Sequence, residues 1–180
     1  CVHLSEKEIE LISSSGTRCV HMPLSNCEVG GGIAPIPELL EKDVCISLGS
    51  DGYINDMFEV MRGAFLIHKA RLQDPGTMRA DQVFEMATLQ GAKALGLENV
   101  GTLEPGFVAD LQLIDANFPT PLSEENLIEQ VILHRSGNHV DSVMIDGKWK
   151  LRNGEILGVD LEKQRESVHR QAKRLWGKNE

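Results

Sequence analysis

A short apolar run in the first third of the chain constrains the fold more than any other feature. The run Val44–Leu48 is too short for a helix, and Gly49 and Gly52 follow it closely, which is typical of a buried strand. Such a strand delivers Asp51 to its carboxyl end, the edge at which α/β folds place ligands and catalytic groups. A turn aspartate that caps the next helix explains the same residues equally well. The run alone therefore does not decide whether Asp51 has a catalytic role or caps a turn.

The segments before this strand predict an alternating order of helices and strands. Ser5 and Glu8 have the spacing of a capping box, which predicts a helix start. Residues 17–22 are predicted to form a strand and residues 38–41 a short helix, and the strand at 44–48 comes next. Helix, strand, helix, strand is the order of a parallel α/β sheet.

Glycine and histidine features in this part have structural explanations. Gly30–Gly32 lacks the Gly-Lys-Ser/Thr continuation of a phosphate-binding loop, so these glycines are predicted to form a flexible connector. A helix over residues 56–72 carries apolar residues at three- and four-residue steps, and His68 lies on that apolar face. A histidine there is more often a packing residue than a ligand. A second helix is predicted over residues 79–95.

The pattern changes near Gly101, where short alternating segments replace the long helices. Asp146-Gly147 and Asn153-Gly154 are strong hairpin signals. An amphipathic terminal helix is predicted from Asp160. Strands are predicted over residues 110–114, 131–133, 140–145 and 149–151. The chain thus divides into an α/β part (1–100), a small antiparallel β unit (101–158) and a terminal helix (159–180).

Charge and composition exclude several classes of protein. The chain has 18 basic and 27 acidic residues, which argues against nucleic acid or an anionic membrane as its main partner. It contains no run of about 18 apolar residues, so no transmembrane helix is expected, and its first residues do not read as a signal peptide. Cys1, Cys19, Cys27 and Cys45 form no Cys-x-x-Cys pair and are expected to be free thiols of a cytoplasmic protein. Because the chain lacks an initial methionine, we expect it to be a fragment of a longer protein.

A series of short motifs occurs in the order found in one known family. The motifs are His21-Met22-Pro23-Leu24-Ser25-Asn26, Gly32–Leu40, Leu48–Gly52, Asp56–Glu59, Met86–Gly96, Gly101–Gly106, Ala109–Leu111, Asp146–Lys148 and Asn153-Gly154. With them the chain resembles the C-terminal half of the metal-dependent amidohydrolases, in the aminohydrolase branch. That branch includes guanine deaminases, methylthioadenosine and S-adenosylhomocysteine deaminases, and triazine chlorohydrolases.

The resemblance implies an α/β fold, the C-terminal part of a (β/α)8 TIM-type barrel followed by a composite β-sandwich. Residues 1–100 would supply the seventh and eighth barrel strands with their helices, and residues 101–158 part of the sandwich. The helix over residues 159–180 would pack back on the barrel. The other barrel strands would lie in a missing N-terminal half, so we expect the chain to need that half, or a swapped copy in a homodimer, to be soluble.

The resemblance also assigns site residues. Asp51 matches the family's strand-eight aspartate, which binds one divalent metal ion and handles a proton of the attacking water; zinc is expected, with iron and manganese as alternatives. His21, Ser25 and Asn26 would lie at the mouth of the site, as substrate contacts or as support for it, and turn capping is the alternative for Ser25 and Asn26. His3 belongs to a His-Leu-Ser-Glu sequence that imitates the strand-five metal signature, but its place in the chain disfavours a ligand role.

The activity implied by the resemblance is the hydrolysis of a C–N bond by metal-activated water. The substrate would be a purine- or pterin-like heterocycle or a nucleoside derivative. Two alternatives stay open, namely a chlorohydrolase that releases halide with the same water and a non-catalytic binding or scaffold member. Because a zinc site needs several ligands and this chain holds at most one of those expected, the chain alone is expected to be inactive.

Overall fold

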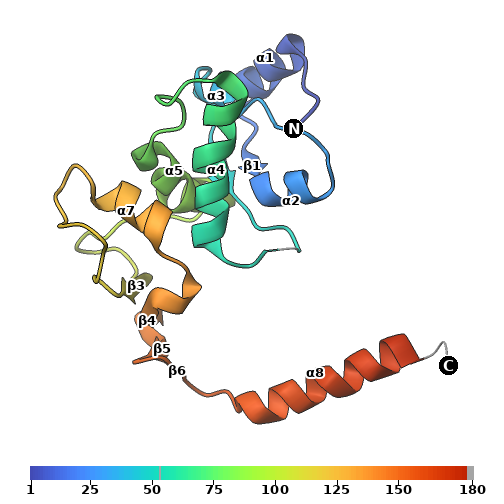
Figure 1. Ribbon diagram of the computed structural model, residues 1–180. Helices are drawn as coiled ribbons and strands as arrows, with labels where there is room; N and C mark the ends of the chain where they lie inside the picture. Colours follow the sequence, from blue (N-terminus) through green and yellow to red (C-terminus); the bar gives the residue numbers. More distant parts are fainter. Residues whose placement is uncertain (53, 178–180) are drawn as a thin grey trace.

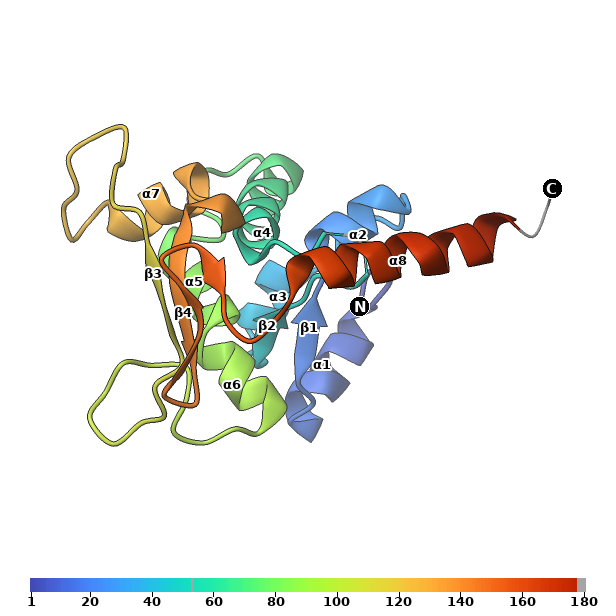
Figure 2. The same ribbon diagram turned by 90° about the horizontal axis from the view of Figure 1, so that it is seen from below.

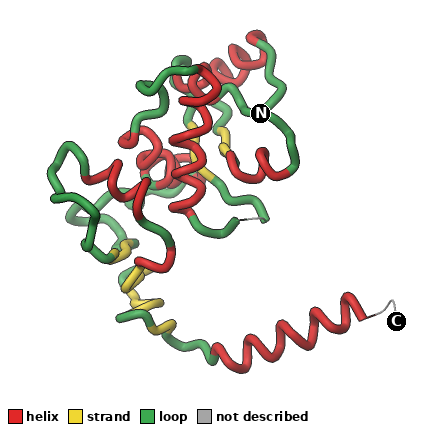
Figure 3. The backbone as a smooth tube through the Cα atoms, viewed as in Figure 1, coloured by secondary structure: helices red, strands yellow, loops and turns green. Residues whose placement is uncertain are grey.

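The computed structural model describes residues 1–52 and 54–177 (Figure 1). The first part contains α1 (Glu6–Ser15), β1 (Cys19–His21), α2 (Pro23–Glu28), α3 (Ile36–Leu40), β2 (Ile46–Leu48), α4 (Met57–Leu72), α5 (Ala80–Ala87) and α6 (Leu89–Leu95). The second part contains β3 (Leu111–Ile114), α7 (Leu127–His134), the 3-10 helix η1 (Gly137–His139), β4 (Val140–Ile145), β5 (Lys148–Arg152), β6 (Glu155–Ile156) and α8 (Leu161–Trp176). In Figure 3 the strands lie in two separate places, one among the helices and one near the start of α8.

The predicted parallel pair is present. β1 and β2 pair in parallel with Val20 opposite Ser47, and α3, α5 and α6 pack against β2 (Figure 2). Along β1, Cys19 and His21 are buried whereas Val20 is 49% exposed. One face of the pair is therefore covered by helices and the other is partly open. A two-stranded parallel sheet of this kind depends on its helical cover, since such sheets are normally buried on both faces.

Local signals at the start of the chain act as predicted. The Ser5 side chain accepts a hydrogen bond from the Glu8 amide, and the Glu8 carboxylate accepts one from the Ser5 amide at 2.7 Å. Gly16 ends α1 in the left-handed conformation, with φ of 67°. These contacts satisfy amide groups that a helix end otherwise leaves without partners.

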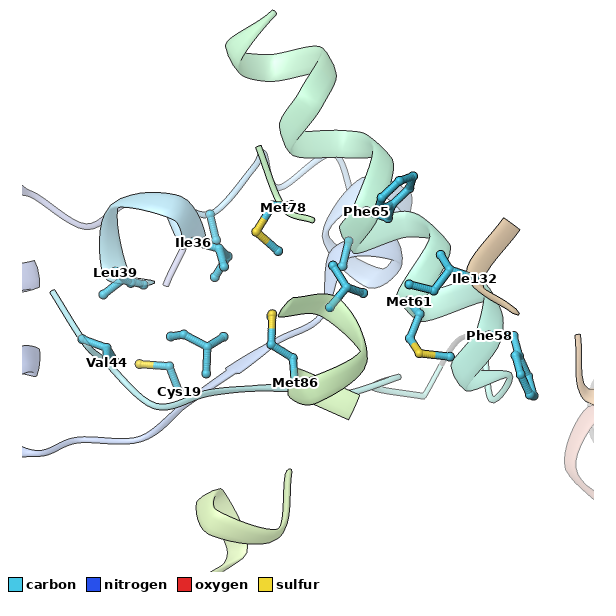
Figure 4. Packing of buried hydrophobic residues seen from close by; sticks show 14 of the residues in the cluster. Cys19, Ile36, Leu39, Val44, Phe58, Met61, Phe65, Met78, Met86 and Ile132 are labelled. Carbon is cyan, nitrogen blue, oxygen red and sulfur yellow. The ribbon is translucent and has the colours of Figure 1, made fainter. Parts of the chain in front are cut away.

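One buried cluster joins both parts of the chain. It extends from β1, α3 and β2 through α4 and α5 to Val131 and Ile132 on α7 (Figure 4). Arg62 on α4 reinforces this junction, because its guanidinium donates to the main-chain oxygens of Ile132 at 3.1 Å and Arg135 at 2.7 Å. The change of pattern near Gly101 is therefore a change of sheet and does not interrupt the core.

The predicted strand over residues 131–133 is wrong, because these residues lie in α7. Ile128, Val131 and Ile132 recur at the spacing of one helix face, and that face packs on α4 and α5. The short run Val-Ile-Leu resembled a strand because its β-branched residues favour strands in general. Burial against two helices overrides that preference here.

Two features of the helices were not predicted. Residues after β1 form α2, which Pro23 begins because a proline suits the first turn of a helix, and Gly30–Gly32 follow it as the predicted connector. The predicted helix over residues 79–95 is split into α5 and α6 at Thr88, which has φ of −122° and ψ of −94°. The Thr88 hydroxyl donates to the Phe84 carbonyl at 2.8 Å, so it competes with the helical hydrogen-bond pattern at the break.

The second sheet is antiparallel with strand order β3-β4-β5-β6. Both predicted hairpins are present, and their turn residues Asp146-Gly147 and Asn153-Gly154 all have positive φ, as tight hairpin turns require. α8 follows, with Asp160 as its N-cap, but none of its described residues is buried and it extends away from the rest of the chain (Figure 1). The packing of this helix against the body, expected from the sequence, is not seen. No helix in the described ranges combines the length and apolar character that a membrane crossing requires.

Candidate active site

Asp51 lies just beyond the carboxyl end of β2, as the sequence predicts. The strand ends at Leu48, and the Gly49 amide continues the pairing by donating to the His21 carbonyl at 3.0 Å. Asp51 has φ of 57°, in the left-handed region that few residues other than glycine adopt. Aspartate tolerates this conformation because its side chain can bond the nearby backbone, and here its Oδ1 accepts from the Gly52 amide at 2.7 Å.

The Asp51 carboxylate has a second partner from a distant part of the sequence. The Ser25 hydroxyl donates to Asp51 Oδ2 at 2.8 Å. This bond, together with that from the Gly52 amide, holds the pKa of Asp51 below its ordinary value. Each carboxylate oxygen keeps further lone pairs, and the side chain is exposed. Asp51 is therefore an ionised, oriented oxygen donor that can bind a cation or accept a proton.

α2 holds Ser25 in place. The serine is 8% exposed, and α2 packs closely on α4 at Gly63. A Cβ atom at residue 63 would lie 2.7 Å from Leu24 Cδ2 and 3.5 Å from Pro23 Cγ. The distance to Leu24 is shorter than van der Waals contact, so the missing side chain at Gly63 lets the two helices approach. Asn26 lies next to Ser25 on α2 and is half-buried.

His21 does not lie at a site mouth as predicted. Its side chain is 2% exposed, and its Nε2 lies 3.1 Å from Nε2 of His68, which is fully buried. Burial, reinforced by the neighbouring His68, lowers the pKa of His21 to about 3. Burial, with Arg71 as the second cause, lowers the pKa of His68 to about 4. Both rings are therefore neutral near pH 7, and one Nε2–H donates to the other ring, which confirms His68 as a packing residue.

The described residues supply only part of a metal site. No group of three or more His, Cys, Asp and Glu side chains lies close enough together within residues 1–52 and 54–177 to hold a metal ion. His3 is exposed in the turn before α1, and the structure shows no contact between it and Asp51. Asp51 suits a divalent ion in charge and exposure, but as one ligand of a set that other residues would have to complete.

Sequence reasoning found Asp51 and Ser25 separately but missed their bond, and it missed the pairing of His21 with His68. Two family motifs were the signal for the first pair, because one contains Ser25 and the other contains Asp51. For the second, the apolar face of α4 predicted a buried His68 but nothing named its partner. Contacts across 26 and 47 positions of sequence depend on how α2 and α4 pack, which local patterns do not encode.

Comparison with known protein families matches residues 1–150 to the amidohydrolase family. The chain belongs to this family. It is 41% identical to a 5'-deoxyadenosine deaminase of Methanococcus aeolicus over 178 residues, which are 97% of this chain and 41% of the relative. It is 38% identical to a 5-methylthioadenosine/S-adenosylhomocysteine deaminase of Pelotomaculum thermopropionicum, over 97% of this chain and 41% of that protein. The chain thus spans about two fifths of the length of these relatives, their C-terminal portion.

Solved structures of the family agree with this assignment. The amidohydrolase chain aligns with an adenosine deaminase from Xanthomonas campestris, determined with bound zinc, at a TM-score of 0.89 and 31% identity, over 96% of this chain and 40% of that one. It also aligns with the zinc complex of an atrazine chlorohydrolase from Arthrobacter aurescens at a TM-score of 0.77 and 23% identity, over 93% of this chain and 38% of that one. The second likeness shows the shared fold alone.

Proposed function

We propose that this chain is the C-terminal part of a zinc-dependent aminohydrolase that deaminates an adenine nucleoside derivative. In this proposal β1 and β2 are the seventh and eighth strands of a (β/α)8 barrel, and the N-terminal half of the same protein supplies the other strands. The relatives named for 5'-deoxyadenosine and 5-methylthioadenosine deamination, at 41% and 38% identity, support this substrate class. Asp51 carries the proposal, because it places an ionised carboxylate at the carboxyl end of a barrel strand, where such enzymes perform their chemistry.

The chemistry needs a water molecule that attacks the carbon bearing the amino group and a base that takes its proton. A zinc ion, when bound, supplies the Lewis acidity that makes such a water reactive near neutral pH. Asp51 would hold the metal ion through one carboxylate oxygen, and the same carboxylate would accept the proton of the attacking water. As the new C–O bond forms and the C–N bond breaks, Asp51 would return that proton to the leaving nitrogen, which departs as ammonia.

The proposal also predicts what the chain cannot do alone. One carboxylate does not make a zinc site, since catalytic zinc commonly has three protein ligands and an open position. Residues 1–180 without the rest of the protein are therefore expected to bind no stoichiometric zinc and to release no ammonia. Stoichiometric zinc binding with turnover by this chain alone would contradict the proposal.

The decisive experiment measures ammonia release by the full-length, zinc-loaded protein with 5'-deoxyadenosine and 5-methylthioadenosine. Asp51→Asn removes the negative charge and the proton acceptor while keeping the shape, and it is expected to lower kcat by about a thousandfold or more. Asp43→Asn is the matched control, because Asp43 is also exposed with a left-handed φ of 56°, but precedes β2 instead of following it. Equal loss of activity in both variants would show that Asp51 matters only for its turn.

The same assay separates the alternatives. Release of chloride from a chlorotriazine without deamination of either nucleoside would favour a chlorohydrolase, which the fold-level likeness to the Arthrobacter aurescens enzyme does not by itself support. A full-length protein that binds no zinc and turns over neither class of substrate would favour a binding or scaffold function.

A further inference from the structure

The Ser25 hydroxyl forms a hydrogen bond to a residue outside its own helix. Helical serines commonly donate back to the carbonyl three or four residues earlier. Ser25 instead donates to Asp51 Oδ2, 26 positions away, although Ser25 is almost fully buried and Asp51 is exposed. A hydroxyl has one hydrogen to donate, so its donor capacity is used on this carboxylate.

Two donors together fix the orientation of the carboxylate. The Gly52 amide bonds Oδ1 at 2.7 Å and the Ser25 hydroxyl bonds Oδ2 at 2.8 Å. The amide restrains the position of Oδ1 only. The second bond restrains Oδ2 as well, and the remaining lone pairs of both oxygens stay available.

We propose that Ser25 is a positioning residue, which holds the Asp51 carboxylate in the orientation required by the metal ion and the attacking water. This inference rests on the proposed function, since it gives Ser25 a role through Asp51. The packing of α2 on α4 supports it, because Leu24 lies against Gly63 and so fixes the distance of Ser25 from the strand end. Residues that hydrogen-bond a metal ligand and so orient it commonly raise metal affinity or rate by about 10- to 100-fold.

Three substitutions at this position separate positioning from simple packing. Ser25→Ala removes the hydroxyl and is expected to weaken metal binding and lower kcat by about 10- to 100-fold, with a smaller effect on KM. Ser25→Thr keeps the hydroxyl and is expected to restore most of both. Ser25→Cys replaces the hydroxyl by a larger thiol that donates only weakly, so an intermediate loss is expected.

Ser47→Ala is the matched control. Ser47 is also a buried serine, it lies on the neighbouring β2, and its hydroxyl donates to the Cys19 carbonyl at 3.3 Å. The control therefore loses a buried hydroxyl that makes no contact with Asp51. It is expected to keep the metal affinity and kcat of the unmodified protein, even if its stability falls.

The experiment uses the full-length protein loaded with Co²⁺, whose visible absorption reports the arrangement of its ligands without any substrate. Chelator competition gives the metal affinity, and circular dichroism checks that each variant is folded.

A changed Co²⁺ spectrum and weakened metal affinity in Ser25→Ala, with recovery in Ser25→Thr, support the inference. A Ser25→Ala protein identical to the unmodified one, or no recovery in Ser25→Thr, overturns it; should Ser25→Ala not fold, the Cys and Thr variants decide in the same way. A protein that binds Co²⁺ in a Ser25-dependent manner but deaminates neither nucleoside overturns the proposed function alone.

Discussion

The buried pair of His21 and His68 makes the stability of this fold sensitive to acid in a way that can be calculated. The two Nε2 atoms lie 3.1 Å apart, and neither Nδ1 has a hydrogen-bond partner among the described residues. Protonation of either ring would place a charge in a buried position beside a second histidine. A fall in pH from 7 to 5 is therefore expected to destabilise the fold. The variant His68→Phe isolates the contribution of one ring to this loss of stability.

The direction in which pH changes the free energy of unfolding follows from the pKa values of the two histidines in the folded and unfolded chains. Burial lowers the pKa of His21 to about 3 and that of His68 to about 4, from an ordinary value of 6.5. Between these values the unfolded chain binds protons that the folded chain does not, so the free energy of unfolding falls as the pH falls. Each histidine contributes about 1.4 kcal/mol per pH unit well below pH 6.5. From pH 7 to pH 5 the loss is about 2 kcal/mol for each ring and about 4 kcal/mol for the pair.

Urea unfolding of the full-length protein at several pH values between 7 and 5 tests this expectation. His68→Phe is less stable at pH 7, because it removes the partner of His21, but its deficit should shrink by about 2 kcal/mol at pH 5. His134→Gln, at an exposed histidine that ends α7, is the control for removing a histidine from the surface. A pH-independent difference between His68→Phe and the unmodified protein would show that burial does not lower the pKa of His68.

Two further predictions concern packing. Gly63→Val is expected to destabilise the full-length protein by about 1–3 kcal/mol, because its side chain would overlap Leu24, and Leu24→Ala in the same protein should relieve part of the loss in a double-mutant cycle of urea unfolding. Arg62→Met keeps the aliphatic stem but removes the donors to the carbonyls of Ile132 and Arg135. We expect a loss of about 1–3 kcal/mol, and unchanged thermal unfolding would contradict this role.

The elements predicted from the sequence are those whose physical cause is local. The capping box of Ser5 and Glu8 is complete within four residues, and each hairpin turn depends on the left-handed conformation of two adjacent residues. The strand at Val44–Leu48 was recognised because its length excludes a helix. In these cases neighbours in the sequence are also the partners in the structure.

The elements that were predicted wrongly depend on partners elsewhere. Residues 131–133 become helical because α4 and α5 bury one face of α7. The helix over residues 79–95 breaks at Thr88, whose hydroxyl bonds the Phe84 carbonyl where α5 gives way to α6. Hydrophobic pattern and intrinsic propensity describe which secondary structure a segment prefers by itself. These preferences differ by only about a few tenths of a kcal/mol per residue, so tertiary packing decides between them.

Several apolar side chains of this chain are exposed. Val20 is 49% exposed on a strand whose two flanking side chains are buried, and Leu175 and Trp176 on α8 are 68% and 74% exposed. The chain aligns over 96% of its length, at a TM-score of 0.89, with a zinc-bound deaminase of which it covers 40%. The relative therefore has a further part that this chain does not match. We therefore expect the remainder of the protein to cover both surfaces. Val20 lies on β1, which pairs with β2, and β2 leads to Asp51. We therefore expect the segment that buries Val20 to supply further metal ligands beside Asp51.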